Sequence, residues 1–170
     1  QYAGSSIRIV GKKGIRMITS VPQSIKNELI AGGAGGYTLL EYGTLVAWED
    51  TANGNPVTFE LEGVRSAYAY KKDEADPVFA QANGLVQYTN VLVGFSDDQC
   101  IPDLLLRPYM KLLSPDGEEL ILYGGIVQRS IGYIAYQNRN AFSPGTDSYD
   151  YIWGIIHHVY GDAYDAEYRG

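Results

Sequence analysis

The sequence predicts a mainly β fold of the α+β class: an antiparallel sheet or β-sandwich with a short N-terminal helix and two C-terminal helices. Up to residue 125, apolar residues alternate with polar ones or form short β-branched and aromatic runs, which is typical of strands. Beyond residue 125 they recur every three or four positions, which is typical of helices packed on a core. Because strands and helices do not alternate regularly, a doubly wound parallel sheet is not expected.

Two strands are predicted at the start of the chain. Residues 6–10 and 14–19 each alternate in hydropathy, and the glycines and lysines of residues 11–14 form a turn between them. This arrangement predicts a hairpin.

A short helix is predicted next, over residues 21–31. Ser20 is a candidate N-cap, Pro22 suits the first helical turn, and apolar residues follow at helical spacing. The four glycines of residues 32–36 end this helix and form a loop.

The middle of the chain predicts further strands. Residues 37–48 form an apolar, β-rich run that indicates a central strand with a kink or bulge at Gly43. Residues 49–56 indicate a polar turn, and residues 57–61 alternate as in a strand. Residues 64–70 fit either a strand or a short helix.

Two more strands are predicted after a charged loop at residues 71–77. They cover residues 85–95 and 101–113. Pro108 lies inside the second, and because proline has no N–H to donate, we expect this strand at a sheet edge or bulged at that point.

A hairpin is the clearest local prediction. Residues 114–117 place Pro115 and Gly117 where a turn prefers them. Apolar residues flank this turn on both sides. We therefore expect residues 109–113 and 118–123 to pair.

The C-terminal part predicts two helices. The first covers about residues 130–137, and residues 138–146 form a loop. Asp147 or Ser148 can cap the second helix.

The length of 170 residues is that of one ordinary domain. We expect residues 1–161 to form a single β-rich module and residues 162–170 to form an acidic tail or the start of a linker. No apolar run approaches the length that spans a bilayer, so membrane insertion is not expected. The net charge of −7 argues against nucleic acid as a partner.

Catalytic signatures are scarce in the sequence, and the acids at residues 147–150 and 162–167, which could supply oxygens to calcium, lack the spacing of an EF-hand loop. His157 and His158 are adjacent, so on a helix they point about 100° apart and cannot readily hold one metal together. Cys100 follows Asp97 and Asp98, whose charges disfavour a thiolate. The sequence therefore predicts no catalytic residue, no metal site and no cofactor, and we do not expect an enzyme.

Aromatic residues are the remaining signal for function, with 15 tyrosines among 170 residues. Flat aromatic faces suit the C–H face of a sugar ring, and neighbouring amides and cations suit its hydroxyls. Aromatic residues at helical spacing also commonly pack on a sheet, which is the alternative. The candidate ligand-binding residues are Trp48, Asn53, Asn55, Tyr136, Gln137, Asn138, Arg139 and Trp153.

Several motifs occur in a characteristic order. They are SIRIVGKKGIRMITSV at residues 6–21, LEYGTLVA at 40–47, RPYMKL at 107–112, Asp-Gly at 116–117, and Arg-Ser at 129–130 leading to Tyr136. Together they resemble a module of large secreted proteins from anaerobic Gram-positive bacteria of gut and rumen. The resemblance covers most of residues 6–160, and the loop at residues 32–36 and the tyrosine-rich C-terminal segment depart from it.

Such modules lie beside dockerins, carbohydrate-binding modules and immunoglobulin-like repeats. The resemblance therefore implies an extracellular, secreted or cell-surface module without catalytic residues, whose partners include neighbouring modules of the same polypeptide. It transfers no binding residue to this chain.

The leading hypothesis is a non-catalytic carbohydrate-binding module for plant polysaccharide, such as starch or a cellulose-type glucan. The alternative is a structural or protein-interaction module of a cell-surface protein. A small glycoside-active enzyme is the third hypothesis, and two carboxylates facing each other across a cleft would favour it.

Overall fold

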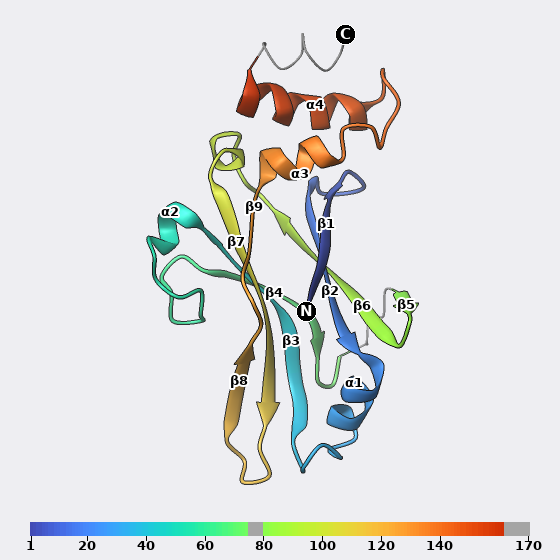
Figure 1. Ribbon diagram of the computed structural model, residues 1–170, viewed down its shortest axis with the longest axis vertical. Coiled ribbons are helices and arrows are strands. Elements are labelled where there is room, and N and C mark those ends of the chain that lie inside the picture. Colours follow the sequence, from blue (N-terminus) through green and yellow to red (C-terminus); the bar gives the residue numbers. More distant parts are fainter. Residues whose placement is uncertain (75–79, 162–170) are drawn as a thin grey trace.

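The computed structural model describes residues 1–74 and 80–161. They form two antiparallel sheets packed face to face, with helices at both ends and at one side (Figure 1). The predicted mainly β fold with two C-terminal helices is thus confirmed. The expected tail at residues 162–170 and part of the expected loop at 71–77 lie outside the described residues.

The first sheet has the strand order β1-β2-β6-β5. Its strands are β1 (Tyr2–Arg8), β2 (Gly14–Pro22), β5 (Ala80–Ala82) and β6 (Leu85–Val93). The second sheet has the order β4-β3-β7-β8, and β9 pairs with the other half of β7. Its strands are β3 (Thr38–Trp48), β4 (Arg65–Lys71), β7 (Asp103–Leu113), β8 (Glu119–Tyr123) and β9 (Val127–Ser130).

Four helices of the described residues flank this sandwich. They are α1 (Gln23–Ile30), α2 (Glu49–Ala52), α3 (Ile131–Gln137) and α4 (Asp147–Tyr160), with a 3-10 turn at Asp98–Cys100. Figure 1 shows α3 and α4 stacked at one end and α1 near the other. None of the described helices is long and apolar enough to cross a membrane.

The larger core lies at the end covered by α3 and α4. Ile15 and Met17 of β2, Leu104 and Leu106 of β7, and Ile156 of α4 are fully buried there. The two helices approach closely because α3 carries a glycine against α4. A Cβ on Gly132 would lie 2.7 Å from a methyl carbon of Val159, which is closer than carbon atoms pack.

A buried polar bridge joins the two sheets in the middle of the sandwich. The hydroxyl of Thr44 in β3 donates to Asn90 Oδ1 in β6 at 3.3 Å. Asn90 Nδ2 in turn donates to the carbonyl oxygen of Ala67 in β4 at 2.7 Å. Since the Thr44 and Asn90 side chains are buried, the bridge satisfies polar atoms that would otherwise be costly to bury.

Strand β3 is buried on both faces, because the segment of residues 53–64 covers the outside of its sheet. Leu45 and Ala47 point outward and pack against Val57. The predicted strand at residues 57–61 is wrong, since this segment forms turns and pairs with no strand. Its alternating apolar residues instead contact the outer face of the sheet.

Several helix boundaries differ from the prediction. Ser20 is not an N-cap: β2 continues to Pro22, and α1 begins at Gln23 without a side-chain cap. Residues 49–52 form a short helix rather than a turn. Helix α4 is capped by Thr146, whose hydroxyl accepts a hydrogen bond from Tyr149 N, and not by Asp147 or Ser148.

The backbone bulge predicted at Gly43 lies in the second sheet. The pairing of β3 with β4 shifts register between Tyr42 and Gly43, which confirms the bulge expected there. A Cβ on Gly43 would lie 2.3 Å from the Ala67 carbonyl oxygen. Residues 64–70, left as strand or helix, form the strand β4.

Pro108 lies in an interior strand, so the prediction that β7 is an edge strand or bulged at Pro108 is wrong. It sits opposite Gly124, between the end of β8 and the start of β9. Gly124 N donates to the Pro108 carbonyl oxygen at 2.7 Å. Pro108 cannot return this bond, and Arg107 Nε donates to the Gly124 carbonyl oxygen at 3.1 Å instead. The predicted hairpin is confirmed, with Tyr109 opposite Tyr123 and Leu113 opposite Glu119.

Candidate functional site

The first candidate is a polar and aromatic cluster on the outer face of the second sheet. Glu41 of β3 lies opposite Lys111 of β7, and the Lys111 Nζ is 3.4 Å from Glu41 Oε1. The hydroxyl of Tyr109 donates to the same Oε1 at 2.7 Å. Burial, together with this hydrogen bond, raises the pKa of Tyr109 far above its usual value. The phenol therefore holds its proton and is a poor acid or base.

This cluster also fixes the covering segment of residues 53–64. The ring of Phe59 meets Tyr109 edge to face at 4.8 Å, and Lys111 Nζ lies 4.3 Å from the centre of the Phe59 ring. Arg107 donates to the Val57 carbonyl oxygen at 3.1 Å and stacks on Tyr123. The motif residues Glu41, Arg107, Tyr109 and Lys111 thus share one face and hold a loop in place.

The first predicted binding group, around Trp48, is not arranged to receive a ligand ring. Trp48 is only 6% exposed, its Nε1 donates to the Gln99 carbonyl oxygen at 2.9 Å, and the Arg65 guanidinium lies 4.9 Å from its ring centre. The expectation that this ring is accessible is therefore wrong. Asn53 and Asn55 are exposed beside a shallow hollow whose lining contains no aromatic residue.

The second predicted group is divided by the turn after α3. Arg139 stacks on the Tyr136 ring at 3.9 Å, and Asn138 Nδ2 donates to the Ile134 carbonyl oxygen at 2.7 Å, so both residues finish the helix. Gln137 is exposed in a hollow formed with β1. Trp153 is 5% exposed and packs beside Tyr149.

Trp153, Tyr149 and Arg139 do share one hollow of about 450 Å³, to which Phe142 also contributes. The Trp153 ring is largely covered there. This arrangement suits core packing better than ring stacking.

A site that the prediction did not single out lies where β9 leads into α3. Tyr133 and Tyr160 are 41% and 39% exposed and line the same hollow of about 290 Å³. The Arg129 guanidinium lies 5.4 Å from the Tyr133 ring centre. We call this the helical-end site, and its residues are Asp103, Gln128, Arg129, Tyr133, Gln137 and Tyr160.

The polar groups of the helical-end site are held in defined positions. Gln128 Nε2 donates to Asp103 Oδ2 at 2.9 Å across the pairing of β9 with β7. Ser130 caps α3 by accepting from Tyr133 N at 3.0 Å, which fixes the turn carrying the Tyr133 ring. A second hollow of about 360 Å³ shares Arg129 and Tyr133 and extends to Gln137.

Part of this site could be recognised from the sequence. Tyr133 and Tyr160 are visible as helical aromatics, but the four-residue strand β9 is too short to be recognised from its pattern. Without β9, nothing in the sequence places Gln128 and Arg129 beside Tyr133.

Burial raises the pKa of Tyr160, and this effect outweighs the hydrogen bond with Ser130, which lowers the pKa. The Tyr160 hydroxyl is therefore protonated at neutral pH.

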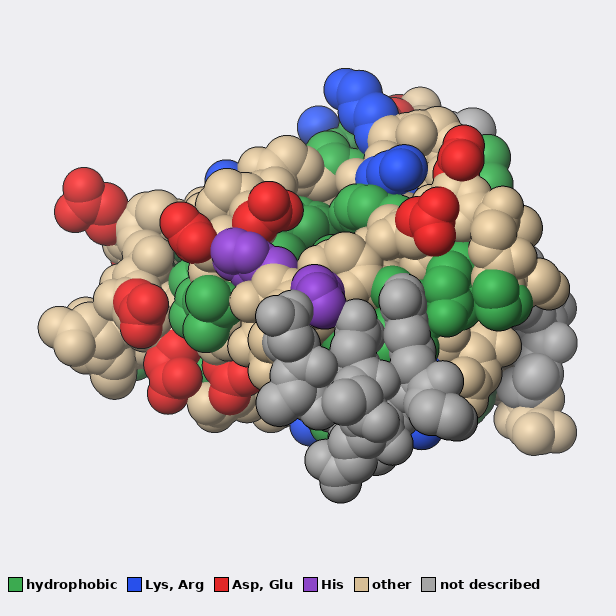
Figure 2. Space-filling view, turned by 90° about the horizontal axis from the view of Figure 1, so that it is seen from above, with side chains coloured by type: hydrophobic (Ala, Val, Ile, Leu, Met, Phe, Trp, Pro, Cys, Tyr) green, Lys and Arg blue, Asp and Glu red, His purple; other side chains and the backbone are tan. Residues whose placement is uncertain are grey.

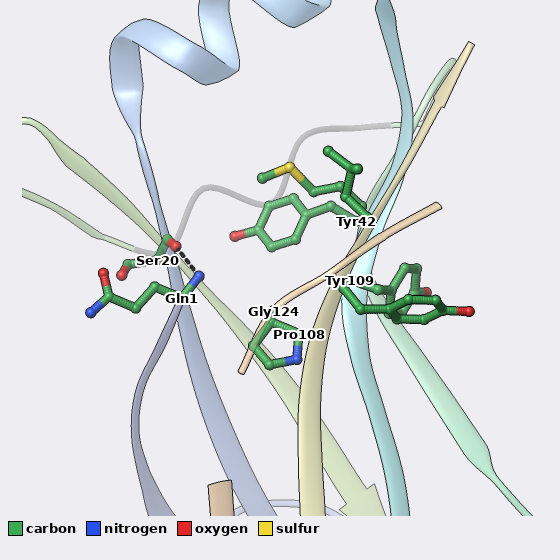
Figure 3. A pocket seen from close by; sticks show the side chains of 9 residues that line it. Gln1, Ser20, Tyr42, Pro108, Tyr109 and Gly124 are labelled. Atoms are coloured by element: carbon green, nitrogen blue, oxygen red, sulfur yellow. Dashed lines mark hydrogen bonds between the residues drawn. The ribbon is translucent and has the colours of Figure 1, made fainter. Parts of the chain in front are cut away.

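A different, apolar hollow of about 210 Å³ lies between the two sheets beside β8. Tyr42, Pro108, Met110 and Leu122 form its walls. Figure 3 shows the Gln1 main-chain nitrogen at its rim, donating to the Ser20 carbonyl oxygen at 2.8 Å. Its size and lining suit a single apolar side chain rather than a sugar.

The remaining reactive side chains are Cys100 and the two histidines. Burial, with a smaller effect of the Asp97 carboxylate, raises the pKa of Cys100 to about 11. His157 and His158 are exposed on α4, and His158 Nε2 is 3.4 Å from Asp98 Oδ1. Figure 2 shows acidic side chains around these histidines. Among residues 1–74 and 80–161, no group of three metal-binding side chains comes together.

No family model, curated protein or solved structure matches this chain.

Proposed function

We propose that this chain is a non-catalytic carbohydrate-binding module, and that it binds plant polysaccharide of the starch or cellulose type through the helical-end site. The observation that carries this proposal is the pair of exposed tyrosines, Tyr133 and Tyr160, lining one hollow together with polar side chains. Exposed aromatic faces beside fixed hydrogen-bonding groups are what a sugar ring requires.

Affinity at such a site comes mainly from stacking. One ring against a flat ligand face contributes about 1–3 kcal/mol, by analogy with base stacking on aromatic side chains. Hydrogen bonds from sugar hydroxyls largely replace bonds to water and contribute less. Tyr133 is the stronger candidate for this role, because Ser130 fixes the start of its helix.

Selectivity among sugars would come from the polar residues. The Gln128–Asp103 hydrogen bond orients an amide and a carboxylate at one side of the site. Arg129 and Gln137 supply further donors along the second hollow. These groups match neutral sugar hydroxyls, which both donate and accept.

The resemblance to modules of secreted proteins from anaerobic bacteria supports an extracellular or cell-surface location beside neighbouring modules. A structural or interaction module is the second candidate function. The exposed edge strand β8 favours it, and the inference below develops that observation.

The proposal is tested by native affinity electrophoresis in gels containing soluble starch, mixed-linkage glucan, xylan or mannan, with pull-down on insoluble cellulose. We expect retardation by a glucan, loss of retardation for Tyr133→Ala, and no change for Tyr68→Ala, which removes an exposed tyrosine of β4. If none of these polysaccharides binds the unmodified chain, the interaction module becomes the better account. Release of reducing ends from the same polysaccharides would instead indicate a glycoside-active enzyme.

A further inference from the structure

The described edges of the two sheets differ in how well they are protected from pairing with another chain. β5 and β9 are short, with three and four residues. β1 has a register shift between Tyr2 and Gly4, and the β4 edge carries Arg65 and Lys71 at its ends. Short strands, irregularities and cations all disfavour edge-to-edge pairing.

β8 has none of these features. Its five residues, Glu119–Tyr123, pair with β7 without any register shift, and they include no lysine, arginine, proline or glycine. Leu120 and Leu122 are 42% and 47% exposed on the inner face of the sheet. An exposed, apolar and regular edge is a template for a further strand.

The hydrogen bonds of the hairpin determine which groups face outward along β8. Ser114 N donates to the Glu118 carbonyl oxygen, and Gly124 N donates to the Pro108 carbonyl oxygen, so residues 118 and 124 face β7. Because the direction alternates along an antiparallel strand, the backbone groups of Glu119, Ile121 and Tyr123 point to the open edge.

We propose that β8 pairs antiparallel with β8 of a second copy of this chain, about a two-fold axis at Ile121. In this register the three outward-facing residues of one strand meet those of the other, which gives about six main-chain hydrogen bonds. Leu120 of one copy lies opposite Leu122 of the partner subunit. The apolar hollow of Figure 3, which Leu122 lines, is thereby extended across the axis.

Charge complementarity favours a second copy as the occupant. Glu119 lies opposite Tyr123 of the partner subunit on the outer face, and within each copy the Arg107 guanidinium stacks on Tyr123 at 4.6 Å. The Glu119 carboxylate of each copy therefore meets a cation of the other, twice per dimer. A self-complementary edge of this kind is what a two-fold interface requires.

The test is sedimentation velocity of the full chain at concentrations up to about 1 mM, with two edge variants. Ile121→Pro removes an outward N–H, which an edge strand tolerates, together with the half-buried Ile121 side chain, and Glu119→Lys reverses the exposed charge. We expect a concentration-dependent dimer for the unmodified chain and a monomer for both variants, with an unchanged thermal melt for Glu119→Lys, whose side chain is exposed. A monomer at all concentrations, or a dimer that survives both changes, overturns the proposal.

A disulfide trap tests the register. Paired residues on the axis have Cα atoms about 5.5 Å apart, which is within disulfide range, so Ile121→Cys is expected to cross-link under mild oxidation. Glu118→Cys is the matched control, because its two copies would lie about 20 Å apart in this register. Equal cross-linking of both variants, or cross-linking of the control alone, contradicts the proposed pairing.

Discussion

Asn90 of one sheet donates a hydrogen bond of 2.7 Å to the carbonyl oxygen of Ala67 in the other sheet, and accepts one from Thr44. This is a polar link through the centre of a sandwich whose other inward-facing residues are mainly apolar. Removing Asn90 leaves the buried Thr44 hydroxyl and the partly buried Ala67 carbonyl without this partner.

Asn90→Leu, a change of similar size, should therefore destabilise the fold by about 1–3 kcal/mol. Urea denaturation measures the difference. Gln87→Leu is the matched control, because Gln87 lies on the other face of the same strand and is half-buried. An equal loss of stability in both variants would show that the bridge has no special role.

Gly43 allows β3 and β4 to approach at the register shift. Gly43→Ala should cost about 1–3 kcal/mol, because the new methyl group would lie 2.3 Å from the Ala67 carbonyl oxygen. Thermal unfolding measures this cost. Gly125→Ala, where the added methyl group meets nothing within 4 Å, should be neutral. A neutral Gly43→Ala would mean that the strands can separate at no cost.

The structure and the sequence pattern place the N-cap of α4 at different residues. Thr146→Ala should destabilise the protein by about 1 kcal/mol, because the hydroxyl of Thr146 accepts from Tyr149 N. Ser148→Ala should have little effect, although the sequence alone makes Ser148 a candidate cap. Helicity and melting temperature of the two variants give the comparison, and the reverse ranking would place the helix start elsewhere.

The Cys100 thiol should react slowly in the folded protein. Its pKa of about 11, against an ordinary value of 9.0, leaves about one hundredth of the thiolate of an exposed cysteine near pH 8. Titration with a disulfide reagent should show this protection and its loss in denaturant. Fast labelling of the native protein would contradict the burial.

The raised pKa of Cys100 also makes the stability of the fold depend on pH. Its contribution to the free energy of unfolding is fully present below pH 9, and it is lost as the pH rises from 9 through about 11.

Local signals predicted most of the fold. The Pro115 and Gly117 turn fixed the β7–β8 hairpin, and the change from period two to helical spacing located α3 and α4. Long-range contacts were not predictable. The burial of Trp48 depends on Gln99 and Arg65, which lie far from it in the sequence. Likewise, only the fold shows that Arg107 supplies the hydrogen bond that Pro108 cannot make.

The exposure of the candidate binding residues could not be predicted for the same reason. A sequence pattern identifies aromatic residues, but exposure of a ring depends on every element packed around it. Trp48 and Trp153 are buried in the larger core, whereas Tyr133 and Tyr160 remain exposed. Their polar neighbours Gln128 and Arg129 come from β9, which sequence periodicity does not reveal.

The central claim is that the Tyr133 ring binds sugar. Calorimetric titration of the Tyr133→Ala variant with the glucan oligosaccharide that binds the unmodified chain best tests it most directly. The account predicts an affinity at least tenfold weaker, which corresponds to about 1.4 kcal/mol, with a melting temperature close to that of the unmodified chain. The Tyr68→Ala variant should bind as the unmodified chain does. An unchanged affinity for Tyr133→Ala, in a chain that does bind the oligosaccharide, would contradict the proposed site.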